Sequence, residues 1–174
     1  MCLINHLKEL IDAGITSFKI EGRMKSAYYV ATVTNAYRHA FDAILSGETD
    51  NFDYVKELEK TSHRLFTTGF YFGDTNKTNL ESSAPVQTHE FMAVVLNDAT
   101  NGKVLIEMRN KFKVGDTLEV LSPNDTFNKT FVVENLTDEE GNAVEIAMKV
   151  KQKLFVKTNL PLKQNDILRK NIEE

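Results

Sequence analysis

The period of the apolar residues changes once along this chain, and that change constrains the fold more than any other feature. Up to about residue 73, apolar residues recur mainly at helical spacing. From Phe91 onward, strand-sized apolar runs are separated by turn residues. The segment 74–90 is rich in Asn, Thr, Ser and Asp and has no apolar period. We therefore expect two parts, residues 1–83 and 84–174.

The first part is predicted to be mostly helical. Helices are expected over 3–11, over 29–44 with Ser26 as the N-cap and an end near Gly47, and over 52–63. Residues 16–21 alternate apolar and charged side chains, which predicts one strand. The aromatic stretch Leu65–Gly73 fits no regular element.

The second part is predicted to be a small antiparallel barrel or sandwich, with no convincing internal repeat. Its strand-sized runs follow each other at intervals of roughly 10–13 residues, as in all-β domains. The predicted strands cover 91–96, 104–108, 117–121, 129–133, 143–147, 154–157 and 167–169.

Composition narrows the class of protein without indicating its chemistry. The net charge is −4 at neutral pH, which argues against a strongly basic nucleic-acid module. Cys2 is the only cysteine, so no disulfide forms within the chain and a cytoplasmic protein is expected. There is neither a signal-peptide pattern nor an apolar run of membrane-spanning length, so we expect no membrane partner.

One strand cannot form a sheet alone, so strand 16–21 must either join the second part or end a larger α/β domain. Helix–strand–helix order is how a parallel α/β barrel ends, and such barrels carry their chemistry where the strands end. Here the strand end presents Lys19, Glu21 and Arg23. We interpret these residues as candidate catalytic groups; a salt-bridged layer at the barrel mouth is the alternative.

Two blocks, FKIEGRMKSAYYVA and SHRLFTTGFYFG, closely resemble peptidase family U32, the collagenase-like proteins. The resemblance covers essentially the whole chain and implies an α+β fold. Residues 1–83 would be the C-terminal remnant of a TIM-type α/β barrel, in the order helix–strand–helix–helix. Residues 84–174 would be the family's C-terminal β-barrel domain, which resembles the second domain of elongation factor Tu.

The resemblance also implies a function for a longer parent protein. Relatives with this layout hydroxylate a wobble uridine in tRNA, using prephenate as the oxygen source, and the β-barrel would dock the substrate. The alternatives are a collagenase-like peptidase whose β-barrel binds a protein or peptide substrate, and a non-catalytic binding or dimerising module. No HExxH, GxSxG or CxxC motif supports a classical protease. We expect the fragment alone to be inactive.

The resemblance implies an iron–sulfur cluster in the parent, with Cys2 as a candidate ligand. A cluster typically takes four thiolates, so no cofactor is expected in this chain alone. The alternative for Cys2 is a small buried residue near a frayed terminus.

Further candidates concern substrate binding. Arg64 lies within a family block and could contact the substrate or a domain interface. Lys149, Lys151 and Lys153 alternate, so on a strand they would share one face and could meet tRNA phosphates. An edge strand protected by lysines is the alternative. The aromatic residues of 66–72 could stack on nucleobases or plug a seam between domains.

Overall fold

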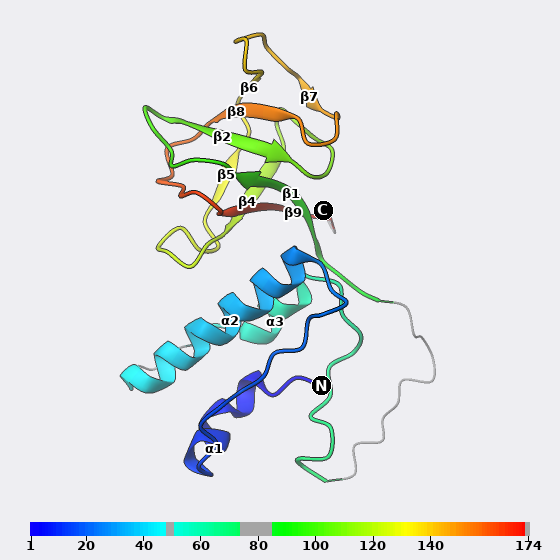
Figure 1. The fold of residues 1–174 in the computed structure, drawn as a ribbon, viewed down its shortest axis with the longest axis vertical. Helices are drawn as coiled ribbons and strands as arrows, with labels where there is room; N and C mark the ends of the chain where they lie inside the picture. Colours follow the sequence, from blue (N-terminus) through cyan, green and yellow to red (C-terminus); the bar gives the residue numbers. More distant parts are fainter. Residues whose placement is uncertain (48–50, 74–84, 173–174) are drawn as a thin grey trace. The chain divides into compact units, whose positions relative to one another are not determined.

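The computed structural model describes residues 1–47, 51–73 and 85–172 (Figure 1). The chain forms two compact units, unit 1 over Met1–Thr88 and unit 2 over His89–Glu174. Unit 1 carries the helices and unit 2 carries an antiparallel sheet. In the described ranges, no helix combines the length and the apolar character that crossing a bilayer requires.

Unit 1 contains a 3-10 turn η1 (Ile4–His6) and the helices α1 (Leu7–Asp12), α2 (Ala27–Ser46) and α3 (Tyr54–Glu59). The predicted caps of α2 are confirmed. Ser26 Oγ accepts a hydrogen bond from Tyr29 N at 3.2 Å, and Gly47 ends the helix at φ 71°, where a side chain would be strained. The helix predicted over 52–63 is shorter, because Asp53 is its N-cap and it ends at Glu59.

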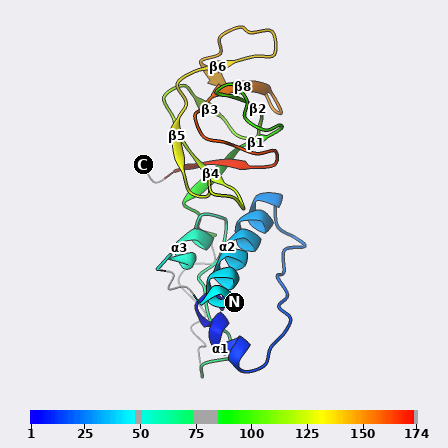
Figure 2. The ribbon, with the colours of Figure 1, turned by 90° about the vertical axis from the view of Figure 1, so that its left-hand side faces the viewer.

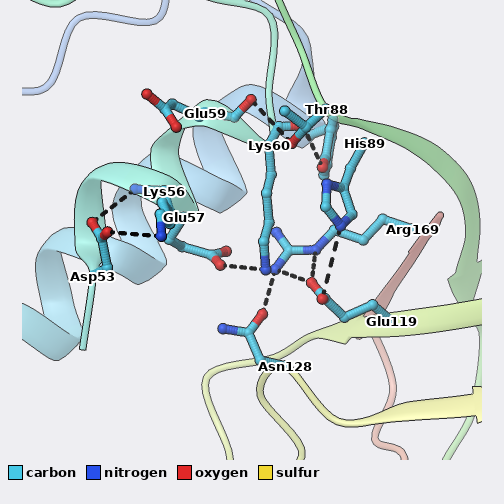
Figure 3. A network of polar contacts seen from close by, with 11 residues as sticks. Asp53, Lys56, Glu57, Glu59, Lys60, Thr88, His89, Glu119, Asn128 and Arg169 are labelled. Atoms are coloured by element: carbon cyan, nitrogen blue, oxygen red, sulfur yellow. Dashed lines mark hydrogen bonds and ion pairs between the residues drawn. The ribbon is translucent and has the colours of Figure 1, made fainter. Parts of the chain in front are cut away.

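The small core of unit 1 joins η1, α1, α2 and α3. Its buried side chains are Ile4, Leu7, Val33, Ala36, Ala40 and Leu58. α3 also carries a buried carboxylate, Glu57, whose Oε2 lies 2.9 Å from Lys60 Nζ in an i,i+3 ion pair (Figure 3). Such a pair is needed because a buried carboxylate without a cation is costly.

The strand predicted over 16–21 is wrong: this segment connects α1 to α2 without forming a strand. A strand exists only when a partner satisfies its backbone groups, and no other strand lies in the described part of unit 1. Ile15 and Ile20 are consequently 37% and 38% exposed. The alternating side chains of this segment are typical of a strand, but the described residues of unit 1 contain no strand with which it could pair.

Unit 2 is a curled antiparallel sheet of seven strands (Figure 2) with a separate two-stranded ribbon. The strands are β1 (His89–Val95), β2 (Lys103–Met108), β3 (Phe112–Lys113), β4 (Thr117–Leu121), β5 (Thr130–Val132), β6 (Leu136–Thr137), β7 (Ile146–Ala147), β8 (Lys153–Lys157) and β9 (Ile167–Asn171). The strand order of the large sheet is β5-β4-β9-β1-β2-β8-β6, and β3 pairs with β7 in the ribbon. The predicted runs thus correspond to strands, and only the two-residue strands β3 and β6 were missed.

Alternation along the strands explains the core of unit 2. Val104 and Ile106 of β2 and Leu154 and Val156 of β8 point to the concave side and are at most 1% exposed. They pack with apolar residues of β1, β4 and β9 in one cluster. The intervening residues of β2 and β8 point to the outer face.

The same four-residue turn precedes the paired strands β4 and β9. In the first turn, Asp116 Oδ2 accepts a hydrogen bond from Lys113 N at 2.8 Å, and in the second, Asp166 Oδ2 accepts one from Lys163 N at 2.8 Å. The third position of each turn has a positive φ, 93° at Gly115 and 73° at Asn165. A short structural repeat, K-x-[GN]-D, therefore exists that the sequence reading did not recognise.

Candidate functional site

A cavity of about 710 Å³ lies in unit 1. It is lined by residues from the N-terminus, α1, α2, the connecting segment 15–21 and the stretch 63–71. Three of the predicted site residues, Cys2, Lys19 and Glu21, line it together, although Cys2 was proposed from the family resemblance and Lys19 and Glu21 from the charged segment end. Arg23 and Arg64 are not among its lining residues.

Helix α2 supplies the wall of this cavity at i,i+4 spacing. Tyr29, Val33, Tyr37 and Phe41 succeed one another four residues apart, so they share one face of the helix. The apolar spacing predicted a helix over 29–44 and did not single out Tyr37 as a polar group at a cavity. The signal available was a tyrosine within an otherwise apolar stripe, since a buried tyrosine hydroxyl usually finds a partner.

Lys19 and Glu21 are exposed at the cavity, with 87% and 69% of their side chains accessible. Lys19 Nζ lies 3.8 Å from Glu21 Oε2, a loose pair of the kind that contributes little to stability. Glu21 Oε1 accepts a hydrogen bond from Arg23 N at 2.9 Å, so the carboxylate is held by the turn that follows it. Within the described residues, these charges lie on an exposed connecting segment and not on a strand.

Cys2 and Tyr37 form the polar contact in the cavity wall. Cys2 Sγ lies 3.8 Å from the Tyr37 hydroxyl, and the same hydroxyl accepts a hydrogen bond from Leu3 N at 3.3 Å. Burial raises the pKa of Tyr37 above its usual value of 10.0, and the neighbouring Cys2 raises it further. Tyr37 is thus a neutral phenol that fixes the N-terminal residues onto α2.

This donor set does not fit an iron–sulfur cluster. The chain contains one cysteine, whereas such clusters are typically held by four thiolates. Across residues 1–47, 51–73 and 85–172, no group of three His, Cys, Asp or Glu side chains is arranged to hold a metal ion. Cys2 is half-buried and its sulfur contacts Tyr37. No chemical step is therefore assigned to a cluster in this chain.

The aromatic stretch has two parts with different environments. Phe66 stacks on His63, with ring centroids 4.5 Å apart and planes at 18°, and it packs against the unit 1 core. Phe70, Tyr71 and Phe72 are 85%, 58% and 50% exposed. Gly69, at φ 64°, separates the two parts. Tyr71 lines the cavity, so this stretch contributes an aromatic ring to the site.

The predicted lysine stripe is not one face of a strand. Lys149 and Lys151 lie in a turn, in which Lys149 O accepts a hydrogen bond from Gln152 N at 2.9 Å and Lys151 has a φ of 58°. Only Lys153 is in β8. All three side chains are exposed, as is Arg64 of unit 1. Their proposed contacts with a substrate stay predictions.

Two family models cover almost all of the chain. The model of peptidase family U32 matches residues 1–81, and that of the peptidase family U32 C-terminal domain matches residues 87–169.

Individual relatives carry more specific descriptions. The chain is 34% identical to tRNA hydroxylation protein P1 of Bacillus subtilis, over 97% of this chain and 41% of the relative. It is 33% identical to tRNA hydroxylation protein P of Escherichia coli, over 83% of this chain and 32% of the relative. The crystallised C-terminal domain of a Geobacillus thermoleovorans protein described as a U32 peptidase is 32% identical, with a TM-score of 0.44, over 47% of this chain and 99% of that domain. The chain thus spans about two fifths of the first relative's length. It belongs to peptidase family U32.

Proposed function

We propose that this chain is the C-terminal part of a cytoplasmic tRNA-hydroxylating enzyme. The observation that carries the proposal is its alignment with tRNA hydroxylation protein P1 through 97% of its residues, across both units. A match of this extent includes the cavity-lining residues of unit 1 as well as the sheet of unit 2. The substrate that the resemblance implies is a uridine at the wobble position.

In this proposal the cavity of unit 1 forms part of the catalytic site. Lys19 binds an anionic group of a substrate, such as a carboxylate, and Glu21 orients Lys19 and the Arg23 backbone. Arg23 supplies a second cation beside them. The high exposure of Lys19 supports this role, because a cation reserved for a ligand need not be neutralised within the protein.

The finer fold assignment is part of the same proposal. Unit 1 is the end of a TIM-type barrel, in which segment 16–21 would pair with strands outside these residues. Its exposed Ile15 and Ile20 support this, because a barrel strand would bury them. Unit 2 resembles the second domain of elongation factor Tu and docks the substrate, with Arg64 and Lys149, Lys151 and Lys153 as further contacts. Cys2 would supply one of the four thiolates of a cluster in the longer parent protein, not in this chain alone.

A chimera tests the proposal directly. The corresponding C-terminal segment of the Bacillus subtilis protein P1 is replaced by this chain, in a strain without its own tRNA hydroxylation proteins. Mass spectrometry of tRNA nucleosides should then detect the hydroxylated uridine. A folded and expressed chimera that leaves tRNA unmodified would contradict the proposal.

A peptidase is the second candidate, favoured by the family's description. The same chimera distinguishes the two functions, because a peptidase would cleave denatured collagen while tRNA stays unmodified. Within the described residues, Cys2 contacts a tyrosine hydroxyl rather than a base that could activate it. We therefore favour hydroxylation.

A further inference from the structure

The outer face of strands β2 and β8 carries an apolar pair at its centre. Leu105 and Phe155 lie directly opposite each other in the antiparallel register. Their strand neighbours point into the core, so these two side chains point outward, where they are half-buried. Among the described residues, neither belongs to the core or packs against it. Phe155 is partly accessible on this face, where Thr137 of β6 lies opposite it on the other side of β8.

Lysines flank this apolar pair on both sides. Two residues away in one direction, Lys103 of β2 lies opposite Lys157 of β8, and two residues away in the other, Lys153 lies opposite Glu107. Each step of two residues spans about 7 Å along a strand. This spacing is comparable to the separation of phosphates along extended single-stranded RNA. The face therefore presents cation, aromatic ring and cation in succession.

Two of these lysines have no carboxylate partner within the described residues. Lys157 Nζ lies 2.8 Å from Glu134 Oε2, and Glu107 Oε1 lies 2.7 Å from Arg109 Nη2. Glu134 and Glu107 are therefore each paired with another cation. Within the described residues, no ion pair forms at Lys103 or Lys153. Lys103 lies directly opposite Lys157, whose charge is already compensated by Glu134. Lys103 and Lys153 are exposed, so an anionic ligand can reach both of them.

We propose that this outer face binds single-stranded RNA, with a base stacked on Phe155 and phosphates contacting Lys103 and Lys153. The inference rests on the proposed RNA-directed function and assigns it a docking surface. An aromatic ring between cations is the arrangement that holds single strands without reading their sequence. The residues involved differ from the lysine stripe expected from the sequence, of which only Lys153 belongs to this face.

The test uses the full 174-residue chain and a single-stranded RNA of about 12 nucleotides, a length within the range of such sites. The RNA carries a fluorescein for anisotropy and a central 2-aminopurine, whose fluorescence falls when the base stacks. Phe155→Leu should abolish the 2-aminopurine signal and weaken binding roughly 5- to 100-fold, the effect of about 1–3 kcal/mol per stacked base.

The double variant Lys103→Gln, Lys153→Gln leaves the packing of the sheet intact and provides the second measurement. Its plot of log K against log salt should be flatter than that of wild type by about 0.7 per lost phosphate contact. Lys129→Gln is the matched control, because Lys129 is an exposed lysine of the same unit near β4 and β5. It should bind as wild type does.

The remaining outcomes show whether the proposed RNA-binding surface, the proposed RNA-directed function or both are wrong. If the chain binds RNA and the face variants behave like Lys129→Gln, the surface is wrong while an RNA-directed function survives. If Phe155→Leu keeps the 2-aminopurine signal, the stacking role is overturned. If the chain binds no RNA but binds an acidic peptide or gelatin through these same residues, both the surface assignment and the proposed function are overturned.

Discussion

Arg169 and Glu119 lie directly opposite each other on β9 and β4, and the guanidinium Nε is 2.7 Å from Glu119 Oε1 (Figure 3). Arg169 is fully buried, and its Nη2 also donates to Asn128 Oδ1 at 2.6 Å. His89 Nε2 lies 3.8 Å from the other oxygen of Glu119. Strand register therefore places a buried cation and its carboxylate together.

Arg169→Met should destabilise unit 2 by about 3–5 kcal/mol, because removing one partner leaves a charge without compensation in a buried site. The double variant Arg169→Met, Glu119→Leu should recover much of this loss, since an apolar pair can replace a buried ion pair. Amide hydrogen exchange of β4 and β9 measures both. Equal losses in the single and double variants would show that the charge pair is not the cause.

Asp116 and Asp166 should each contribute to stability, because each holds the same kind of turn through a backbone hydrogen bond of 2.8 Å. Replacing either by Ala should cost about 1.5–3 kcal/mol, the range for a lost hydrogen bond to a charged group. Denaturant unfolding of each variant measures the cost. Asp125→Ala, at an exposed loop position, is the control and should leave stability unchanged.

Asp116 should also make unit 2 sensitive to acid. Burial alone would raise its pKa, but hydrogen bonds from Lys170 Nζ and Lys113 N lower it below the usual 3.8. A carboxyl whose folded pKa is lowered stabilises the fold above the unfolded value, and this contribution is lost as the pH falls through the folded pKa. The Asp116→Ala variant should therefore lose less of its free energy of unfolding than wild type does as the pH falls through this range.

Much of this fold could be predicted because local signals sufficed. Ser26 and Gly47 define the ends of α2, and alternation located the strands of unit 2. The errors share one cause, which is that alternation describes side chains and not backbone pairing. Segment 16–21 alternates but has no partner strand here, and Lys149 and Lys151 alternate within a turn.

The site was predictable only in part for a related reason. Lys19 and Glu21 were selected from the alternating charges and Cys2 from the family resemblance, and the structure places all three at one cavity. Their roles stay predictions. Tyr37 was missed because an i,i+4 stripe gives no sign of which side a hydroxyl faces. Arg169 could not be recognised either, since only the register reveals that Glu119 lies opposite.

Tyr37 should make unit 1 sensitive to alkali. Its folded pKa is raised above the usual 10.0 by burial, so the folded chain holds the phenol proton more tightly than the unfolded chain does. This contribution is complete below pH 10 and is lost as the pH rises further, by about 1.4 kcal/mol per pH unit. Urea unfolding followed by helical circular dichroism measures it, because all described helices lie in unit 1. In the Tyr37→Phe variant, the free energy of unfolding should no longer fall in this additional way above pH 10. If it falls as steeply with pH as in wild type, Tyr37 is excluded as the cause.

Lys19 should matter for activity and not for stability. Its side chain is 87% exposed and its pair with Glu21 is loose, so Lys19→Ala should leave the unfolding midpoint of the chain unchanged. In the chimera with protein P1, the same substitution should reduce tRNA hydroxylation roughly 10- to 100-fold, the effect of about 1.5–3 kcal/mol for a lost charged contact. Lys56→Ala is the control, because Lys56 is an exposed lysine of unit 1 that does not line the cavity. Full hydroxylation by the Lys19→Ala chimera would remove Lys19 from the site, whereas an equal loss in both variants would point to general damage to the chimera.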